Sequence, residues 1–144
     1  MIHGPQTGNS FYGVMTSFLN SQDSADFAGP GGWNDPDALF VGAVADMNVV
    51  EMKTAFALWA FAKAPLMLSA DLNKLGNVND TSSMAYWLNN TEMLAISQDR
   101  LGHQAKSIDN FNATGESDTL GYYVSLNENA TSKDQYFALL IVNW

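Results

Sequence analysis

The sequence contains the stretch Gly31-Gly-Trp-Asn-Asp-Pro-Asp37, which places an aromatic ring next to two carboxylates. Pro36 fixes its own φ angle and pushes Asp35 into an extended conformation. Because residues i and i+2 of an extended chain share a side, we expect Asp35 and Asp37 to face one way, just after Trp33 and Asn34. Fixed carboxylates beside an aromatic ring are typical of sugar pockets, since hydroxyl groups need acceptors. The alternative is a turn in which Asn and Asp side chains bond their own backbone.

Helices are predicted on both sides of this stretch. Apolar residues recur at helical spacing over residues 10–20 and over residues 48–63. Asn48 and Glu51 form a capping-box pattern at the start of the second helix, and a proline ends it. Residues 65–68 are then a continuous apolar run, which predicts a short buried strand.

Two short helices are predicted at residues 82–88 and 91–97. After residue 107 the composition changes, and polar loops alternate with β runs. Alternation predicts that Tyr122, Val124 and Leu126 share one face of a strand. We expect this strand to pair antiparallel with the apolar run at 136–144.

Four motifs in a fixed order resemble a known family. They are Ala28-Gly-Pro-Gly-Gly-Trp-Asn-Asp-Pro-Asp37, Ala57-Leu-Trp-Ala-Phe-Ala-Lys-Ala-Pro-Leu66, Ser69-Ala-Asp-Leu72 and Leu94-Ala-Ile-Ser-Gln-Asp-Arg-Leu-Gly102. Together they resemble the glycoside hydrolase family 27 α-galactosidases, or melibiases.

The resemblance implies an α/β fold. Residues 1–105 would be the last part of a (β/α)8 TIM barrel, and residues 106–144 would begin a C-terminal antiparallel β-sandwich. Active sites of such barrels lie at the carboxyl ends of the strands. The resemblance therefore places residues 33–37 there, after the seventh strand.

The resemblance also implies a retaining hydrolase of terminal α-D-galactosyl residues, in which one carboxylate attacks and another acts as acid and base. Asp37 would line the sugar site beside Trp33, with Asp35 in a supporting position. The family nucleophile lies in a Lys-Tyr-Asp motif that this sequence lacks, and Gln6 falls near the acid/base position. We therefore expect a fragment, inactive alone.

Three interpretations stay open: an incomplete enzyme, a non-catalytic carbohydrate-binding remnant, and a chain without a function of its own. Within the enzyme interpretation, α-N-acetylgalactosaminidase is an alternative specificity. The partner that the resemblance implies is an α-galactoside oligosaccharide or glycoconjugate. The sequence leaves the oligomeric state open.

Composition excludes several classes of function. A net charge of −9 leaves no basic surface for nucleic acid or for an anionic membrane. The absence of cysteine and the distance between the two histidines argue against a metal site, and no cofactor is predicted.

Four N-x-Thr sequons indicate a secreted or lysosomal/vacuolar glycoprotein, with chance as the alternative. Their asparagines are Asn79, Asn89, Asn112 and Asn129.

Overall fold

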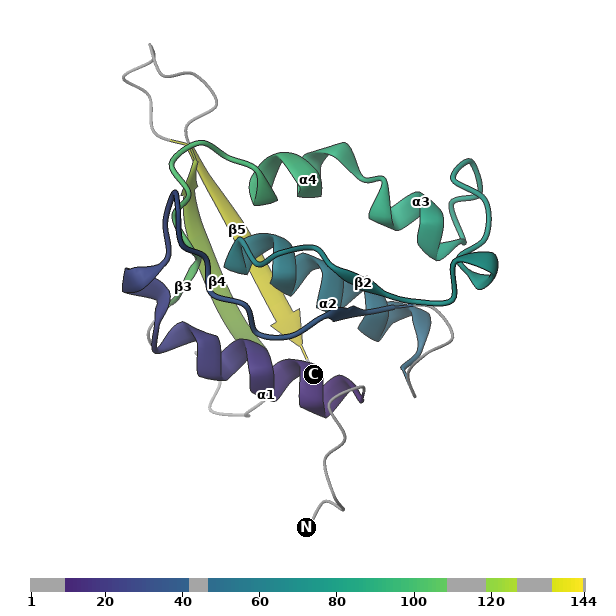
Figure 1. Cartoon of the computed structure of the whole chain (residues 1–144), viewed down its shortest axis with the longest axis horizontal. Coiled ribbons are helices and arrows are strands. Elements are labelled where there is room, and N and C mark those ends of the chain that lie inside the picture. The colour runs from purple at the N-terminus through teal and green to yellow at the C-terminus, as the bar shows by residue number, and fades with distance from the viewer. Residues whose placement is uncertain (1–9, 42–46, 109–118, 127–135, 144) are drawn as a thin grey trace, which may run out of the picture.

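The computed structural model describes residues 10–41, 47–108, 119–126 and 136–143 (Figure 1). Their elements follow in the order α1 (Phe11–Gln22), η1 (Ala25–Phe27), β1 (Leu39–Phe40), α2 (Val49–Ala62), β2 (Leu68–Ser69), η2 (Leu72–Lys74), α3 (Met84–Leu88), α4 (Thr91–Ser97), β3 (Lys106–Ser107), β4 (Thr119–Leu126) and β5 (Tyr136–Asn143).

Helix α2 is the centre of the fold. Met52 and every residue from 55 to 62 are buried, so the helix is apolar on all sides. It contacts α1, α3, α4 and β1, and it also packs against β4 and β5 (Figure 1). Helices and sheet therefore share one hydrophobic cluster, in which Trp59, Phe18 and Tyr122 are the largest fully buried side chains.

The predicted helices are confirmed with small shifts at their ends. α1 begins after its N-cap Ser10 as expected and runs two residues further than predicted. The capping box of α2 is present, with both reciprocal hydrogen bonds made by Asn48 and Glu51. α2 ends at Ala62, and its C-cap Lys63, two residues before Pro65, has a left-handed φ of 56°. A left-handed residue at this position terminates the helix and redirects the chain.

Two short parallel strands flank α2 in the sequence. β1 pairs with β2 in the register Leu39↔Leu68, and α2 forms the crossover between them. This βα-β arrangement confirms the α/β class. The predicted buried strand at 65–68 is shifted to Leu68–Ser69, and its burial was wrong because Met67 and Leu68 are 67% and 45% exposed.

The predicted antiparallel pair is confirmed as β4 and β5, in the register Tyr123↔Leu139. The sequence did not predict the third strand, β3, which pairs with β4 through Lys106↔Tyr123. Tyr122 and Val124 are buried toward α2 as the alternation predicted.

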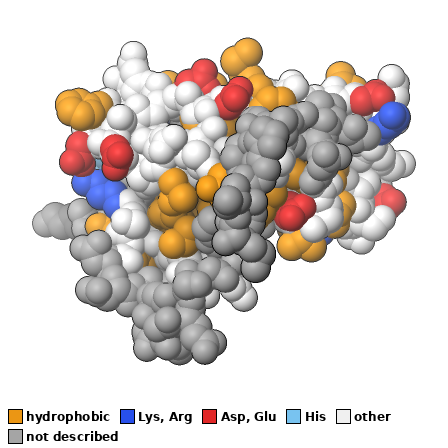
Figure 2. Space-filling view, turned by 90° about the horizontal axis from the view of Figure 1, so that it is seen from below, with side chains coloured by type: hydrophobic (Ala, Val, Ile, Leu, Met, Phe, Trp, Pro, Cys, Tyr) orange, Lys and Arg blue, Asp and Glu red, His pale blue; other side chains and the backbone are white. Residues whose placement is uncertain are grey.

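The opposite face of this sheet is apolar and exposed. Its side chains are Tyr123, Phe137, Leu139 and Ile141, which are 39–60% exposed. On the molecular face shown in Figure 2, acidic side chains are scattered, and hydrophobic side chains reach the surface between them. No helix in the described ranges has the length and apolar character needed to cross a bilayer.

Candidate functional site

A tight glycine turn brings the chain into the site. The backbone N–H of Gly29 donates to the carbonyl of Gly32 at 2.8 Å, and the reverse bond measures 2.9 Å. Gly31 has a φ of 100°, in the region that side chains rarely adopt. The turn therefore depends on glycine at this position, and it delivers Trp33 immediately afterwards.

Trp33 lies against a second glycine. A Cβ added to Gly102 would lie 2.6 Å from Cη2 of Trp33 and 2.8 Å from Cδ of Pro30. The indole therefore packs closely over Gly102, at the end of the fourth recognised motif. Because Trp33 remains 43% exposed, part of its ring is open to a ligand.

The amide of Asn34 joins three segments. Its Nδ2 donates to the carbonyl of Ser24 and to Oε1 of Gln104, both at 2.8 Å. Nε2 of Gln104 in turn donates to the carbonyl of Ser21 at 3.1 Å. Gln104 is only 3% exposed, so this chain of hydrogen bonds is shielded from water. Sequence reasoning missed Gln104, which lies two residues beyond the recognised motif.

Asp35 lines a polar hollow beside α1. The hollow has a volume of about 330 Å³, and its other lining residues are Ser17, Asn20, Ser21, Ser24, Asn34 and Pro36. The Asp35 carboxylate is exposed and makes no hydrogen bond within the described part of the chain. Hydroxyl, amide and carboxylate groups in one hollow can accept and donate hydrogen bonds to a polyhydroxylated ligand.

Asp37 has different surroundings. Its Oδ1 accepts a hydrogen bond from the backbone N–H of Ala38 at 2.7 Å. Its carbonyl accepts from Nε1 of the buried Trp59 at 2.9 Å, so α2 anchors the backbone at this point. Among the described residues, Oδ2 of Asp37 has no hydrogen-bond donor, and the side chain is exposed. This oxygen is available to a sugar hydroxyl.

The motif lies next to the first strand of the described structure. Residues 33–37 come directly before β1 (Leu39–Phe40), and the described residues preceding them contain no strand apart from the isolated Gly29–Gly32 bridge. Residues 33–37 belong to no strand of the described structure, and ladder pairing begins at Leu39. Within the described ranges, the site segment therefore lies at the amino end of β1.

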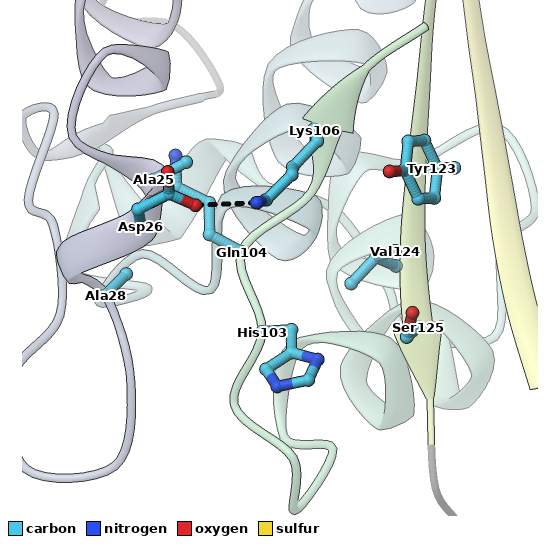
Figure 3. A pocket seen from close by; sticks show the side chains of 9 residues that line it. All are labelled: Ala25, Asp26, Ala28, His103, Gln104, Lys106, Tyr123, Val124 and Ser125. Atoms are coloured by element: carbon cyan, nitrogen blue, oxygen red, sulfur yellow. Dashed lines mark hydrogen bonds and ion pairs between the residues drawn. The ribbon is translucent and has the colours of Figure 1, made fainter. Parts of the chain in front are cut away.

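A separate polar cleft is lined by none of residues 33–37 (Figure 3). It has a volume of about 380 Å³ and lies between η1, residues 103–106 and β4. Figure 3 shows Lys106 reaching toward Asp26, and the Nζ–Oδ1 distance is 2.6 Å. The hydrogen bond from Lys106, together with its charge, lowers the pKa of the Asp26 carboxyl. His103, Tyr123 and Ser125 also line this cleft.

The sequence of this chain matches a known protein family. The family described as Alpha galactosidase A matches residues 6–99. This chain belongs to that family. The matched segment contains the glycine turn, Trp33, both carboxylates of the motif and the whole of α2.

The family relatives include plant and animal enzymes. An alpha-galactosidase of Oryza sativa subsp. japonica is 41% identical over 102 residues, which are 70% of this chain and 23% of the relative. Alpha-galactosidase A of Homo sapiens is 39% identical over 99 residues, or 67% and 21% of the two chains. An alpha-N-acetylgalactosaminidase of Gallus gallus is 36% identical over 101 residues, or 69% and 24%. The chain thus aligns with about a fifth to a quarter of each relative's length.

The other predicted site residues are divided between described and undescribed parts of the chain. Gln6, Asn112 and Asn129 lie outside the described residues. Asn79 and Asn89 are both exposed, on either side of α3. Within the described ranges, no three His, Asp or Glu side chains gather as a metal-binding group.

Proposed function

We propose that this chain is part of an α-galactosidase-type glycoside hydrolase, which removes terminal α-D-galactosyl residues with retention of configuration. The observation that carries the proposal is the family match over residues 6–99, which contains the complete segment from Trp33 to Asp37. In this segment, a half-exposed indole and an available carboxylate oxygen follow a glycine turn. This combination of apolar wall and acceptor suits the C–H face and hydroxyl groups of galactose.

We also propose the finer architecture that the family resemblance implies. Parallel β1 and β2 with the crossover helix α2 would be the last units of a (β/α)8 barrel. The β3–β4–β5 sheet would begin an antiparallel sandwich, since sandwich sheets bury apolar side chains on facing surfaces. The exposed apolar face of this sheet supports that proposal.

The role of this chain in the reaction is binding. A retaining hydrolase needs a nucleophilic carboxylate and an acid/base carboxylate about 5 Å apart. The sequence contains no Lys-Tyr-Asp motif, and no Asp or Glu precedes Asp23. Gln6, near the acid/base position, has an amide that cannot transfer a proton as a carboxyl does. We infer that Asp37 and Trp33 hold the galactosyl group, with Asp35 in support, and that the 144-residue chain does not hydrolyse it.

Two measurements on the purified chain test this proposal. Release of aryl alcohol from an aryl α-D-galactoside at about pH 5 is expected to stay at the level of a blank. We expect the parent chain to bind galactose, as measured by saturation-transfer NMR. In Asp37→Ala the affinity should weaken about tenfold or more, because a charged acceptor is lost.

The matched control is Asp80→Asn. Asp80 is an exposed carboxylate whose Oδ1 accepts hydrogen bonds from the backbone N–H and the hydroxyl of Ser82, and asparagine keeps an acceptor there. Galactose affinity should therefore remain unchanged in this variant. Turnover that disappears in Asp37→Asn would contradict the binding role, and galactose binding that survives Asp37→Ala would contradict the assigned sugar contact.

A second specificity is favoured by one comparison, since the chicken relative is an alpha-N-acetylgalactosaminidase. The same NMR experiment with N-acetylgalactosamine separates the two substrates. Tighter binding of the acetamido sugar than of galactose would support the second specificity.

We further propose that the protein is a secreted or lysosomal/vacuolar glycoprotein with an α-galactoside oligosaccharide or glycoconjugate as its partner. The support is the set of N-x-Thr sequons at Asn79, Asn89, Asn112 and Asn129. The absence of cysteine leaves no disulfide to indicate an oxidising compartment, so the sequons carry this proposal alone.

A further inference from the structure

Two of the N-x-Thr sequons lie in the described part of the chain, and their asparagine side chains differ from their neighbours. The side chains of Asn79 and Asn89 are exposed and make no hydrogen bond within the described ranges. By contrast, Asn77 accepts the backbone N–H of Asn79, and Asn90 accepts two N–H groups at the start of α4. Asn79 and Asn89 are therefore free to carry a covalent group without loss of a cap or turn.

Asn89 lies beside an aromatic ring. Tyr86 lies in α3, and Asn89 is the C-cap residue of that helix three positions later. Tyr86, Asn89 and Val78 line one hollow of about 240 Å³. Tyr86 is 38% exposed and Val78 is 52% exposed, so apolar surface meets water next to the amide of Asn89.

The Tyr86 ring packs against Trp87. The two rings meet edge to face, with centroids 6.0 Å apart and an interplanar angle of 82°. Nε1 of Trp87 donates to the carbonyl of Thr81 at 3.1 Å, and Nζ of Lys53 lies 4.0 Å from the centre of the Trp87 ring. This platform holds Tyr86 in place, so a group stacked on it loses little additional freedom.

We propose that Asn89 carries an N-linked glycan whose first N-acetylglucosamine packs on Tyr86 and Val78. In the transfer, the amide Nδ2 of Asn89 forms a bond to the anomeric carbon of the sugar. The bond between that carbon and the pyrophosphate oxygen of a lipid-linked oligosaccharide breaks, and the amide loses one proton. The hydroxyl of Thr91, at the second position after Asn89, completes the acceptor pattern. The proposal rests on the proposed secretory location and not on hydrolase activity.

Asn79 provides an internal comparison. The residue three positions before it is Gly76, which offers no side chain for a sugar to cover. A glycan at Asn79 would therefore extend into water without an aromatic contact of this spacing. The packed glycan is therefore assigned to Asn89 and not to Asn79.

Occupancy is tested by expressing the full chain behind a secretion signal in a eukaryotic host. Glycopeptide mass spectrometry is expected to find Asn89 modified, and Asn89→Gln should lose one glycan mass relative to the parent. The matched variant Asn79→Gln should keep the Asn89 glycan. An unmodified Asn89 in secreted protein overturns the proposal, whether or not the other sequons are occupied. Because this readout involves no hydrolysis, its failure is distinct from failure of the galactoside proposal.

Packing is tested by removing the glycan enzymatically from the folded protein. Removal should lower the Tm of the parent by about 3 °C, since apolar surface on Tyr86 and Val78 becomes exposed again. The shift should persist in Tyr86→Phe, which keeps the ring, and disappear in Tyr86→Ala. Should Tyr86→Ala not fold, nuclear Overhauser contacts between the first sugar and the Tyr86 ring in the parent decide the matter. Their absence overturns the packing.

Discussion

The contact between Trp33 and Gly102 holds the aromatic wall of the site. We expect Gly102→Ala to destabilise the protein by about 2 kcal/mol, as overpacking commonly does. The new methyl group would meet Cη2 of Trp33 at 2.6 Å, and the φ of +64° at this position disfavours any side chain. Urea denaturation of the parent and the variant measures the loss. Galactose binding should weaken in the same variant, because the indole must shift.

The control for this substitution is Gly29→Ala. An added Cβ there meets no heavy atom within 4 Å, and the backbone is not left-handed. Stability should stay the same or rise slightly, because alanine restricts the unfolded chain. Equal losses in the two variants would contradict a specific role for the Trp33–Gly102 contact.

Lys63 is a buried cation, 4% exposed, whose Nζ donates to the carbonyl of Ile96. Burial lowers the pKa of its ammonium from 10.5, and the charge of Asp99 raises it in part. Between the folded and unfolded pKa values the unfolded state binds more protons, so the free energy of unfolding increases with pH. The parent should therefore gain stability relative to Lys63→Met as the pH rises from neutral toward 10.5, the ordinary pKa of the ammonium.

The pH experiment compares denaturant midpoints of the two proteins, so groups that titrate in both cancel. Lys74→Met serves as the control, since Lys74 is exposed and its ion pair with Asp71 spans 3.6 Å. A constant difference between the parent and Lys63→Met over this pH range would show that the folded protein does not perturb Lys63.

The N-terminus of α2 is stabilised by a capping box that the sequence predicts and the structure contains. Asn48 Oδ1 accepts from the N–H groups of Val50 and Glu51 at 2.9 and 3.1 Å, and Glu51 Oε2 accepts from the N–H of Asn48 at 2.7 Å. We expect Asn48→Ala to lower the free energy of unfolding by about 1 kcal/mol, measured by urea denaturation.

Asn48→Ser tests whether that loss comes from the cap itself. Serine is a comparable N-cap residue, so this variant should recover most of the stability. A loss as large as that of Asn48→Ala would assign the effect to some other contact of Asn48. Because α2 touches both the parallel strands and the antiparallel sheet, damage to its first turn should reduce the cooperativity of unfolding only slightly.

For the molecule as a whole, we expect the exposed face of the antiparallel sheet to promote self-association. β5 has no charged residue and no proline, and it lies at the edge of the described sheet order β3–β4–β5. Such a strand invites pairing with other chains. Leu139→Lys, at a position 57% exposed, should therefore reduce self-association of the purified chain in light scattering.

A comparison with Leu140→Lys provides the control. Leu140 is partly buried and packs against the hydrophobic cluster. Its replacement by lysine should therefore destabilise the fold without reducing self-association. Identical scattering of Leu139→Lys and the parent over a range of concentrations would show that this face does not drive association.

Local patterns were sufficient for most of the elements. Helical periodicity, capping residues and strand alternation correctly predicted α1, α2, α4 and the β4–β5 pair, because these signals act between residues close in sequence. The two-residue strand β3 was missed, since Lys106 and Ser107 have no apolar alternation and pair only because β4 lies beside them. β2 was predicted to be buried, but Leu68 is exposed. The burial of a strand depends on the elements packed around it, which its own sequence does not specify.

The sequence by itself determined the family, the capping of α2 and the identity of the sugar-contact candidates Trp33 and Asp37, because each depends on short motifs of residues close in sequence. Only the tertiary structure showed that Gln104 joins Asn34 to α1, and that Gly102 supports the indole. It also showed that Asp35 and Asp37 have different surroundings, although alternation along an extended chain predicts that both face the same side. The physical reason is that burial and hydrogen bonding between distant segments arise only when the chain is folded, and no local spacing encodes them.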